Sequence, residues 1–190
     1  CTKSNEGFAT AGGVQYVACA GNFKDAGLEY TGALKVLQMI FSYEYLWIQI
    51  RVKGGAYGCM CSFSDQGDSM FVTYRDPNLS ESYKVYDEAA DYVADFDADD
   101  RDMKKYIIGT IGSMDMPMEA VDMGARSFHA YFLGKTEADL QKVRDQVLSC
   151  TQEDIRALAP IVKAVVEAGN RCCIGNEEKI DQNKEYFDEV

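Results

Sequence analysis

The sequence predicts an α+β domain in which a mostly antiparallel sheet is covered by helices. Residues 58–75 form two strand-like runs around a polar turn that contains a glycine, which is typical of a β-hairpin. Helical patterns lie before and after this hairpin, and a further strand-like run comes late in the chain, at 169–175. Strands and helices in this order favour an α+β fold.

The elements before the hairpin are predicted from residue type and spacing. A strand is expected at 13–21, where β-branched, aromatic and small residues lie between glycines. A long, largely buried helix should follow Thr31 and run to Arg51. Its apolar residues recur at roughly helical spacing, at Leu34, Leu37, Phe41 and Ile48. The glycine pair at 54 and 55 should then end this helix.

The region after the hairpin is predicted to be mostly helical. Helices are expected at 80–96 and 99–113, and Pro117 suits the first turn of another. Thr136 and Thr151 are each followed, three residues later, by an aspartate, which is the pattern of a capping box at a helix start. After the returning strand, residues 180–190 should form a closing helix or tail.

Composition limits which kinds of partner are compatible with the chain. The 190 residues are 47% apolar, enough for one core, so we expect a single domain over 1–190. Nineteen basic residues against 31 acidic ones give a formal charge of -12, which repels nucleic acid and anionic membrane surfaces. The sequence has no run of 18 or more uncharged apolar residues, so a membrane helix is not predicted. Neither nucleic acid nor membrane is therefore expected as a partner.

The cysteines indicate a reducing compartment. Their number is seven, and their spacings suit neither a disulfide scaffold nor a zinc ribbon. Reduced, mostly buried thiols in a cytoplasmic protein are expected instead. The chain opens on Cys1 and not on methionine, so we expect it to be part of a longer polypeptide.

Several catalytic patterns are incomplete in this sequence. Gly134-Lys-Thr136 resembles the end of a phosphate-binding loop, but His129 takes the place of the required glycine. The aspartates from Asp95 to Asp99 open like a calcium loop, but the glycine and the closing glutamate are missing, so a solvated helix boundary is expected.

A metal site within the chain is also not expected. His129 is the only histidine, so no H-x-x-E-H or H-E-x-x-H zinc motif exists, and a packed or half-exposed role is expected for it. Four thiolates could converge only if their strands were neighbours, and adjacent cysteines in a strand point to opposite faces. Those cysteines are Cys59, Cys61, Cys172 and Cys173.

The octapeptide Arg51-Val-Lys-Gly-Gly-Ala-Tyr57-Gly concentrates the candidate site residues. Gly54, Gly55 and Gly58 leave room for a backbone or a ligand to approach. Arg51 offers a charged fork of donors and Tyr57 a neutral hydroxyl, a pair that suits a carbonyl or a developing oxyanion. Spacing alone supports equally a structural interpretation, with the glycines as a helix cap and Tyr57 packed in the core.

The segment IRVKGGAYG, between a long helix and a hairpin, resembles the C-terminal part of the pitrilysin (insulinase) family of zinc metallopeptidases, in the presequence protease-like branch. The order of elements over the whole chain is similar to the last of four homologous domains, with the LuxS/MPP-like metallohydrolase fold. The resemblance implies that Arg51 and Tyr57 bind substrate and transition state, that Gly54, Gly55 and Gly58 adjoin the substrate, and that zinc lies in the first domain.

The resemblance also implies the remaining partners. They are a peptide substrate and the other domains of the same polypeptide, and an uncovered apolar face could let the isolated fragment form a homodimer. The fragment alone should be inactive because it lacks H-x-x-E-H. Two alternatives stay open: a catalytically inactive structural or assembly domain of the same family, and a stand-alone α+β domain that binds a small ligand.

Overall fold

The computed structural model describes residues 3–190, and its strands form a five-stranded sheet in the order β1-β5-β2-β4-β3. β1 runs parallel to β5, and the other neighbouring pairs are antiparallel. The predicted mostly antiparallel sheet is thus confirmed. The strands are β1 (Glu6–Thr10), β2 (Tyr16–Asn22), β3 (Gly58–Phe63), β4 (Asp68–Tyr74) and β5 (Asn170–Asn176).

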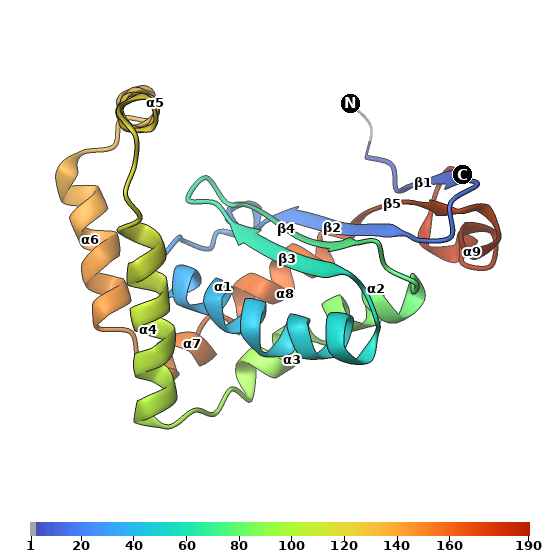
Figure 1. The fold of residues 1–190 in the computed structure, drawn as a ribbon, viewed down its shortest axis with the longest axis horizontal. Coiled ribbons are helices and arrows are strands. Elements are labelled where there is room, and N and C mark those ends of the chain that lie inside the picture. The colour runs from blue at the N-terminus through green and yellow to red at the C-terminus, as the bar shows by residue number, and fades with distance from the viewer. Residues whose placement is uncertain (1–2) are drawn as a thin grey trace.

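Helices cover one face of this sheet and lie at both of its ends (Figure 1). They are α1 (Ala33–Tyr43), α2 (Ser80–Asp87), α3 (Ala89–Ala94), α4 (Asp100–Met114), α5 (Ala120–Phe132), α6 (Glu137–Leu148), α7 (Gln152–Arg156), α8 (Ala159–Glu167) and α9 (Glu177–Asp181). Two 3-10 helices, Phe23–Ala26 and Lys184–Tyr186, and a π-helix, Trp47–Lys53, complete the described elements.

The core lies between the sheet and the helices α1, α2, α3 and α8, which Figure 1 shows beneath the strands. Inward-facing strand residues and helix residues are both fully buried, among them Val17, Phe71, Leu37, Ile40 and Val162. Two buried tyrosines of α2 bind the sheet through their hydroxyls: Tyr83 donates to the Cys172 carbonyl and Tyr86 to the Val17 carbonyl, each at 3.1 Å. These bonds fix the helical layer against the strands.

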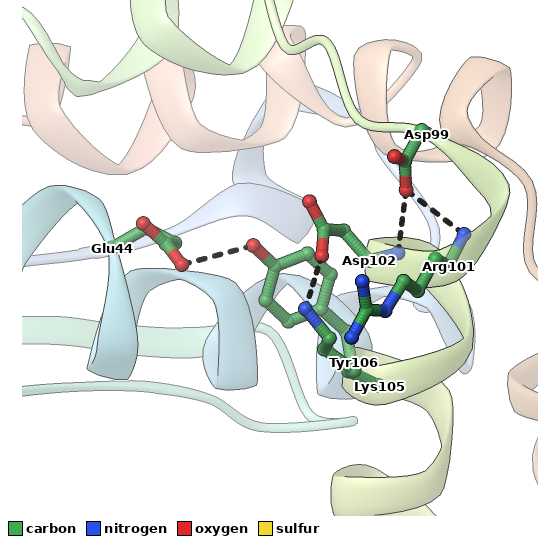
Figure 2. A network of polar contacts seen from close by, with 6 residues as sticks. All are labelled: Glu44, Asp99, Arg101, Asp102, Lys105 and Tyr106. Carbon is green, nitrogen blue, oxygen red and sulfur yellow. Dashed lines mark hydrogen bonds and ion pairs between the residues drawn. The ribbon is translucent and has the colours of Figure 1, made fainter.

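The start of α4 is held by a polar network at the end of α1 (Figure 2). The Asp99 carboxylate accepts the backbone N–H groups of Arg101 and Asp102 at 2.9 Å, which makes it a helix N-cap. The Tyr106 hydroxyl donates to Glu44 at 3.1 Å. The pKa of Tyr106 is raised, mainly by burial and in addition by this carboxylate. The predicted acidic helix boundary is confirmed.

Local sequence signals located several elements correctly. The hairpin of β3 and β4 is present, and both predicted capping boxes form, at Thr136 with Asp139 and at Thr151 with Asp154. In each box the threonine side chain and the aspartate side chain bond reciprocally to the backbone of the helix start.

Other boundaries differ from the prediction. The helix expected to run to Arg51 is interrupted at Glu44, whose φ of -112° and ψ of -89° lie outside the helical region, and it continues as the π-helix Trp47–Lys53. The helix expected at 80–96 is divided between α2 and α3. Pro117 lies ahead of α5, which begins at Ala120 after an N-cap at Glu119. Residues 180–190 contain the end of α9 and a 3-10 turn.

Candidate functional site

The π-helix Trp47–Lys53 carries Arg51 to the end of the sheet. Its wider turn follows the break at Glu44, and short π segments of this kind occur frequently at functional sites. Ile50 is buried and anchors the segment, while Trp47 and Arg51 are exposed one turn apart. The segment thereby presents one aromatic and one cationic side chain on the same surface.

A double glycine ends this segment and turns the chain into β3. Gly55 has a φ of +80°, which favours glycine, and its N–H donates to the Arg51 carbonyl at 3.0 Å. A Cβ at Gly54 would lie 2.5 Å from the Ile50 carbonyl oxygen. The predicted helix-ending role of both glycines is therefore confirmed by their geometry.

Buried polar groups hold the turn from below. Asn78 donates from its side-chain amide to the Gly54 carbonyl at 2.6 Å and from its backbone N–H to the Asp76 carboxylate at 2.9 Å. The other Asp76 oxygen accepts the Ser82 hydroxyl at 2.6 Å. Burial raises the pKa of Asp76, although these hydrogen bonds act in the opposite direction. This network positions the turn between Arg51 and Tyr57.

Arg51 and Tyr57 are brought together by this turn. The Arg51 Nη1 atom donates to the Tyr57 carbonyl oxygen at 2.7 Å. The guanidinium carbon lies 4.3 Å from the Trp47 ring centroid and 5.7 Å from that of Tyr57, both within the range of a cation–π contact. The arginine is thus fixed between two aromatic rings, and its other N–H donors have no protein partner within residues 3–190.

The Tyr57 side chain is 64% exposed. The alternative in which it packs in the core is wrong. Its backbone N–H donates to the Arg75 carbonyl at 3.3 Å, and Arg75 itself adopts a left-handed φ of 49°. Its ring meets Tyr74 edge-on, with centroids 5.8 Å apart. The ring therefore lies at the surface, beside the arginine.

Gly58 differs from the two glycines of the turn. A Cβ there would meet only the Cβ of Tyr74, at 3.9 Å, so no local packing requires glycine at this position. The packing around Gly58 thus differs from that around Gly54, where a Cβ would clash with the backbone.

Three aromatic residues near the site were not predicted. Trp47 precedes Arg51 by four residues, a spacing that places two side chains one helical turn apart and could have indicated the stacking. Tyr74 and Tyr16 lie on neighbouring strands with their rings 5.4 Å apart. Trp47 also borders a cavity of about 690 Å³ between α1, α4 and β3, which Cys59 and Met114 line as well.

The remaining chemical candidates take structural places. Within residues 3–190 no group of three or more His, Cys, Asp or Glu side chains is placed to hold a metal ion, so the described residues do not fit zinc. Burial raises the pKa of Cys59 to about 11 and that of Cys173 to about 12. His129 lies on α5 and is exposed.

In the described part of the chain no helix has both the length and the apolarity to cross a membrane.

Comparison with solved structures defines the class of fold. The chain is similar to the inactive domain of a peptidase M16 from Pseudomonas fluorescens, with a TM-score of 0.67 and 15% identity over 92% of this chain and 44% of that one. It is similar also to pitrilysin, with a TM-score of 0.59 and 11% identity over 91% of this chain and 19% of that one. The fold is therefore that of an M16 peptidase domain.

Sequence comparison identifies the family. The model of the PreP C-terminal domain matches residues 5–176, and the chain belongs to this family. It is 43% identical to Protein HypA of Clostridium perfringens over 99% of the chain, and 34% identical to presequence protease 1 of Arabidopsis thaliana over 93%. The chain spans 19% and 16% of the lengths of these two relatives. The resemblance that the octapeptide indicated is confirmed.

Proposed function

We propose that residues 1–190 form the single, C-terminal domain of a longer zinc metalloendopeptidase that degrades unfolded oligopeptides. In this proposal Arg51 and Tyr57 bind the substrate next to the bond that is cleaved. The observation that carries the proposal is the pairing of an exposed, aromatic-stacked guanidinium with an exposed tyrosine hydroxyl in a chain of this family.

The geometry suits recognition of a peptide carbonyl. One N–H of Arg51 holds the Tyr57 carbonyl, which leaves further donors of the same fork directed at the surface. The Tyr57 ring, 5.7 Å from the guanidinium carbon, carries a hydroxyl that is a second donor. Two preorganised donors of this kind stabilise negative charge that develops on a carbonyl oxygen during peptide hydrolysis. The open space above Gly58 supports the approach of the substrate backbone.

The metal belongs to another part of the polypeptide in this proposal. The relatives include named presequence proteases, and the described residues here do not assemble a zinc site. The chain alone is accordingly proposed to be inactive. Its contribution is to complete an active site whose metal the other domains carry.

Those other domains are the proposed partners of the chain. No residue of α5 is fully buried, yet the helix carries large apolar side chains, including Phe128, Tyr131 and Phe132. Such a surface is typical of a contact with another protein part. We assign it to the remaining domains, and the isolated chain would then form a homodimer through the same helix.

A cytoplasmic location is also part of the proposal. Its support is the set of free thiols at Cys19, Cys59, Cys61, Cys150, Cys172 and Cys173, which suits a reducing compartment. The name of the Arabidopsis relative places that protein in chloroplasts and mitochondria. Fractionation of the source cells, with detection of the full-length protein, decides between the cytoplasm and an organelle.

Peptide cleavage by the full-length parent protein tests the proposed function. Replacing Arg51 by Ala or Tyr57 by Phe should lower kcat by about 100-fold to 1000-fold, because each change removes one donor to the developing oxyanion. Lys53→Ala and Tyr43→Phe serve as matched controls, since both side chains are exposed near the same surface. Normal cleavage by both site variants would reduce the chain to a structural domain.

A further inference from the structure

The outer face of the sheet carries no helix within residues 3–190 (Figure 1). Strand side chains alternate between the two faces, and the inward set, such as Val17, Phe71 and Cys173, is buried under the helices. The outward set includes large apolar residues that remain in contact with solvent. A contiguous exposed apolar surface is typical of a binding site.

The outward residues form one continuous row across the strands. Phe8 on β1 is the register partner of Ile174 on β5, and Ile174 is the partner of Tyr16 on β2. The Tyr16 ring meets Tyr74 on β4 at 5.4 Å, and Tyr74 meets Tyr57 at 5.8 Å. The row of Phe8, Ile174, Tyr16, Tyr74 and Tyr57 therefore ends at Arg51. We call it the aromatic row.

The members of the row are uncharged, and each is between 38% and 64% exposed. The neighbouring register row has small side chains at its centre, Cys172 on β5 and Ala18 on β2. Glu6 on β1 and Met60 on β3 stand at the ends of that neighbouring row, so the ridge of large side chains borders a shallow track at the centre of the face. That shape suits a single extended chain better than the flat surface of a folded domain.

The dimensions of the track match a short peptide. Five strands at a spacing of about 4.8 Å span about 19 Å from the first to the last. An extended peptide rises about 3.3 Å per residue with side chains alternating in direction, so about six residues cover the row and about three of their side chains face it.

We propose that the aromatic row is a binding site for apolar side chains at alternate positions of an extended peptide substrate, on one side of the bond that is cleaved. This inference rests on the proposed function, because its occupant is the peptide held by Arg51 and Tyr57. The substrate peptide is assigned as the occupant because the row is continuous with those two residues. The absence of charge on the row's members selects apolar rather than cationic substrate side chains, despite the net charge of -12.

The test uses the full-length parent protein and two fluorescent peptides of about 12 residues, one with leucine and one with serine at the same alternate positions. The variants are Tyr16→Thr and Ile174→Thr, which place a residue with high β-propensity in each strand. Met70→Thr is the control, because Met70 is 45% exposed on the same face but belongs to another register row.

Each row variant should raise the KM for the leucine peptide about tenfold, with kcat unchanged, and leave the serine peptide unaffected. Met70→Thr should change neither. Binding of both peptides, measured by fluorescence anisotropy, should show the same discrimination even if the parent does not cleave them. The binding measurement tests the aromatic row without requiring cleavage. The proposed function, in contrast, fails if Arg51→Ala cleaves peptides normally.

Two results would overturn the inference. Equal losses with both peptides would mean that the row only supports the fold, which thermal unfolding of the variants would reveal as well. An unchanged leucine preference in both row variants would mean that the substrate does not bind the row. A changed mass of these variants in analytical ultracentrifugation would then show that a second copy covers it.

Discussion

The Arg51 guanidinium and the Tyr57 carbonyl are joined by a 2.7 Å hydrogen bond across the end of a π-helix. The arginine thus contributes to the local structure as well as presenting donors to the surface. The tyrosine takes part in this bond through its backbone, so its side chain can be altered without breaking it. This difference separates the two residues experimentally.

Arg51→Ala should lower the free energy of unfolding of the 190-residue chain by about 1 kcal/mol, because it removes a partly exposed hydrogen bond and the contact with Trp47. Tyr57→Phe should change it by less than about 0.5 kcal/mol, since only an exposed hydroxyl is lost. Urea denaturation of both variants measures the difference. Equal effects would show that the hydrogen bond does not stabilise the turn.

Gly54→Ala should destabilise the chain by about 1–3 kcal/mol, because the new Cβ would lie 2.5 Å from the Ile50 carbonyl oxygen and force the backbone to move. Gly58→Ala is the matched control. Its Cβ would make only an ordinary contact at 3.9 Å, so stability should stay unchanged or rise by up to about 1 kcal/mol. Thermal unfolding compares the pair, and a larger loss at Gly58 would contradict the turn geometry.

Asp76 should give the stability of the chain a specific pH dependence. Burial raises its pKa in the folded state above the ordinary value of about 3.9, so the folded state binds the proton more tightly than the unfolded state. The contribution of this group is therefore fully present below pH ~3.9 and is lost as the pH rises through the folded-state pKa. Asp76→Asn should lack this loss.

Urea midpoints of the wild type and Asp76→Asn, measured from pH 4 to pH 7, check the sign. The wild type should lose stability relative to the variant as the pH increases. The reverse trend would mean that the hydrogen bonds from Ser82 and Asn78 outweigh burial and lower the pKa.

The surface of α5 should govern self-association of the isolated chain. Phe128→Ser combined with Tyr131→Ser should weaken any dimer by at least about tenfold, yet change the free energy of unfolding of the monomer by less than about 1 kcal/mol, because α5 has no buried residue. Ile108→Ser, at an exposed apolar position on α4, is the control. Sedimentation equilibrium measures the effect, and a monomeric wild type at about 100 µM would contradict the prediction.

Features with local causes could be predicted from the sequence. The hairpin turn, the capping boxes at Thr136 and Thr151, and the boundary at Asp99 each depend on residues within four positions. The glycine turn and the candidate pair of Arg51 and Tyr57 lie within one octapeptide, so a short motif was sufficient to find them.

Features with distant causes could not be predicted in this way. β1 was missed because its five residues gain their partner from β5, more than 160 positions later. The roles of Tyr16 and Tyr74 depend on which strands are neighbours and which face the helices leave uncovered. The break at Glu44 interrupts an apolar pattern that continues in the sequence, so periodicity alone predicted one continuous helix and missed both the break and the π-helix after it.

The pairing of β1 with β5 has a consequence for the synthesis of the protein on the ribosome. Both β1 and β2 require β5 as a neighbour, and residues 170–176 emerge last among the five strands. Contacts of such long sequence separation form slowly, and an incomplete sheet exposes strand edges that aggregate. The domain should therefore close only after its final strand has left the exit tunnel, which makes chaperone protection of the nascent chain most valuable at that stage.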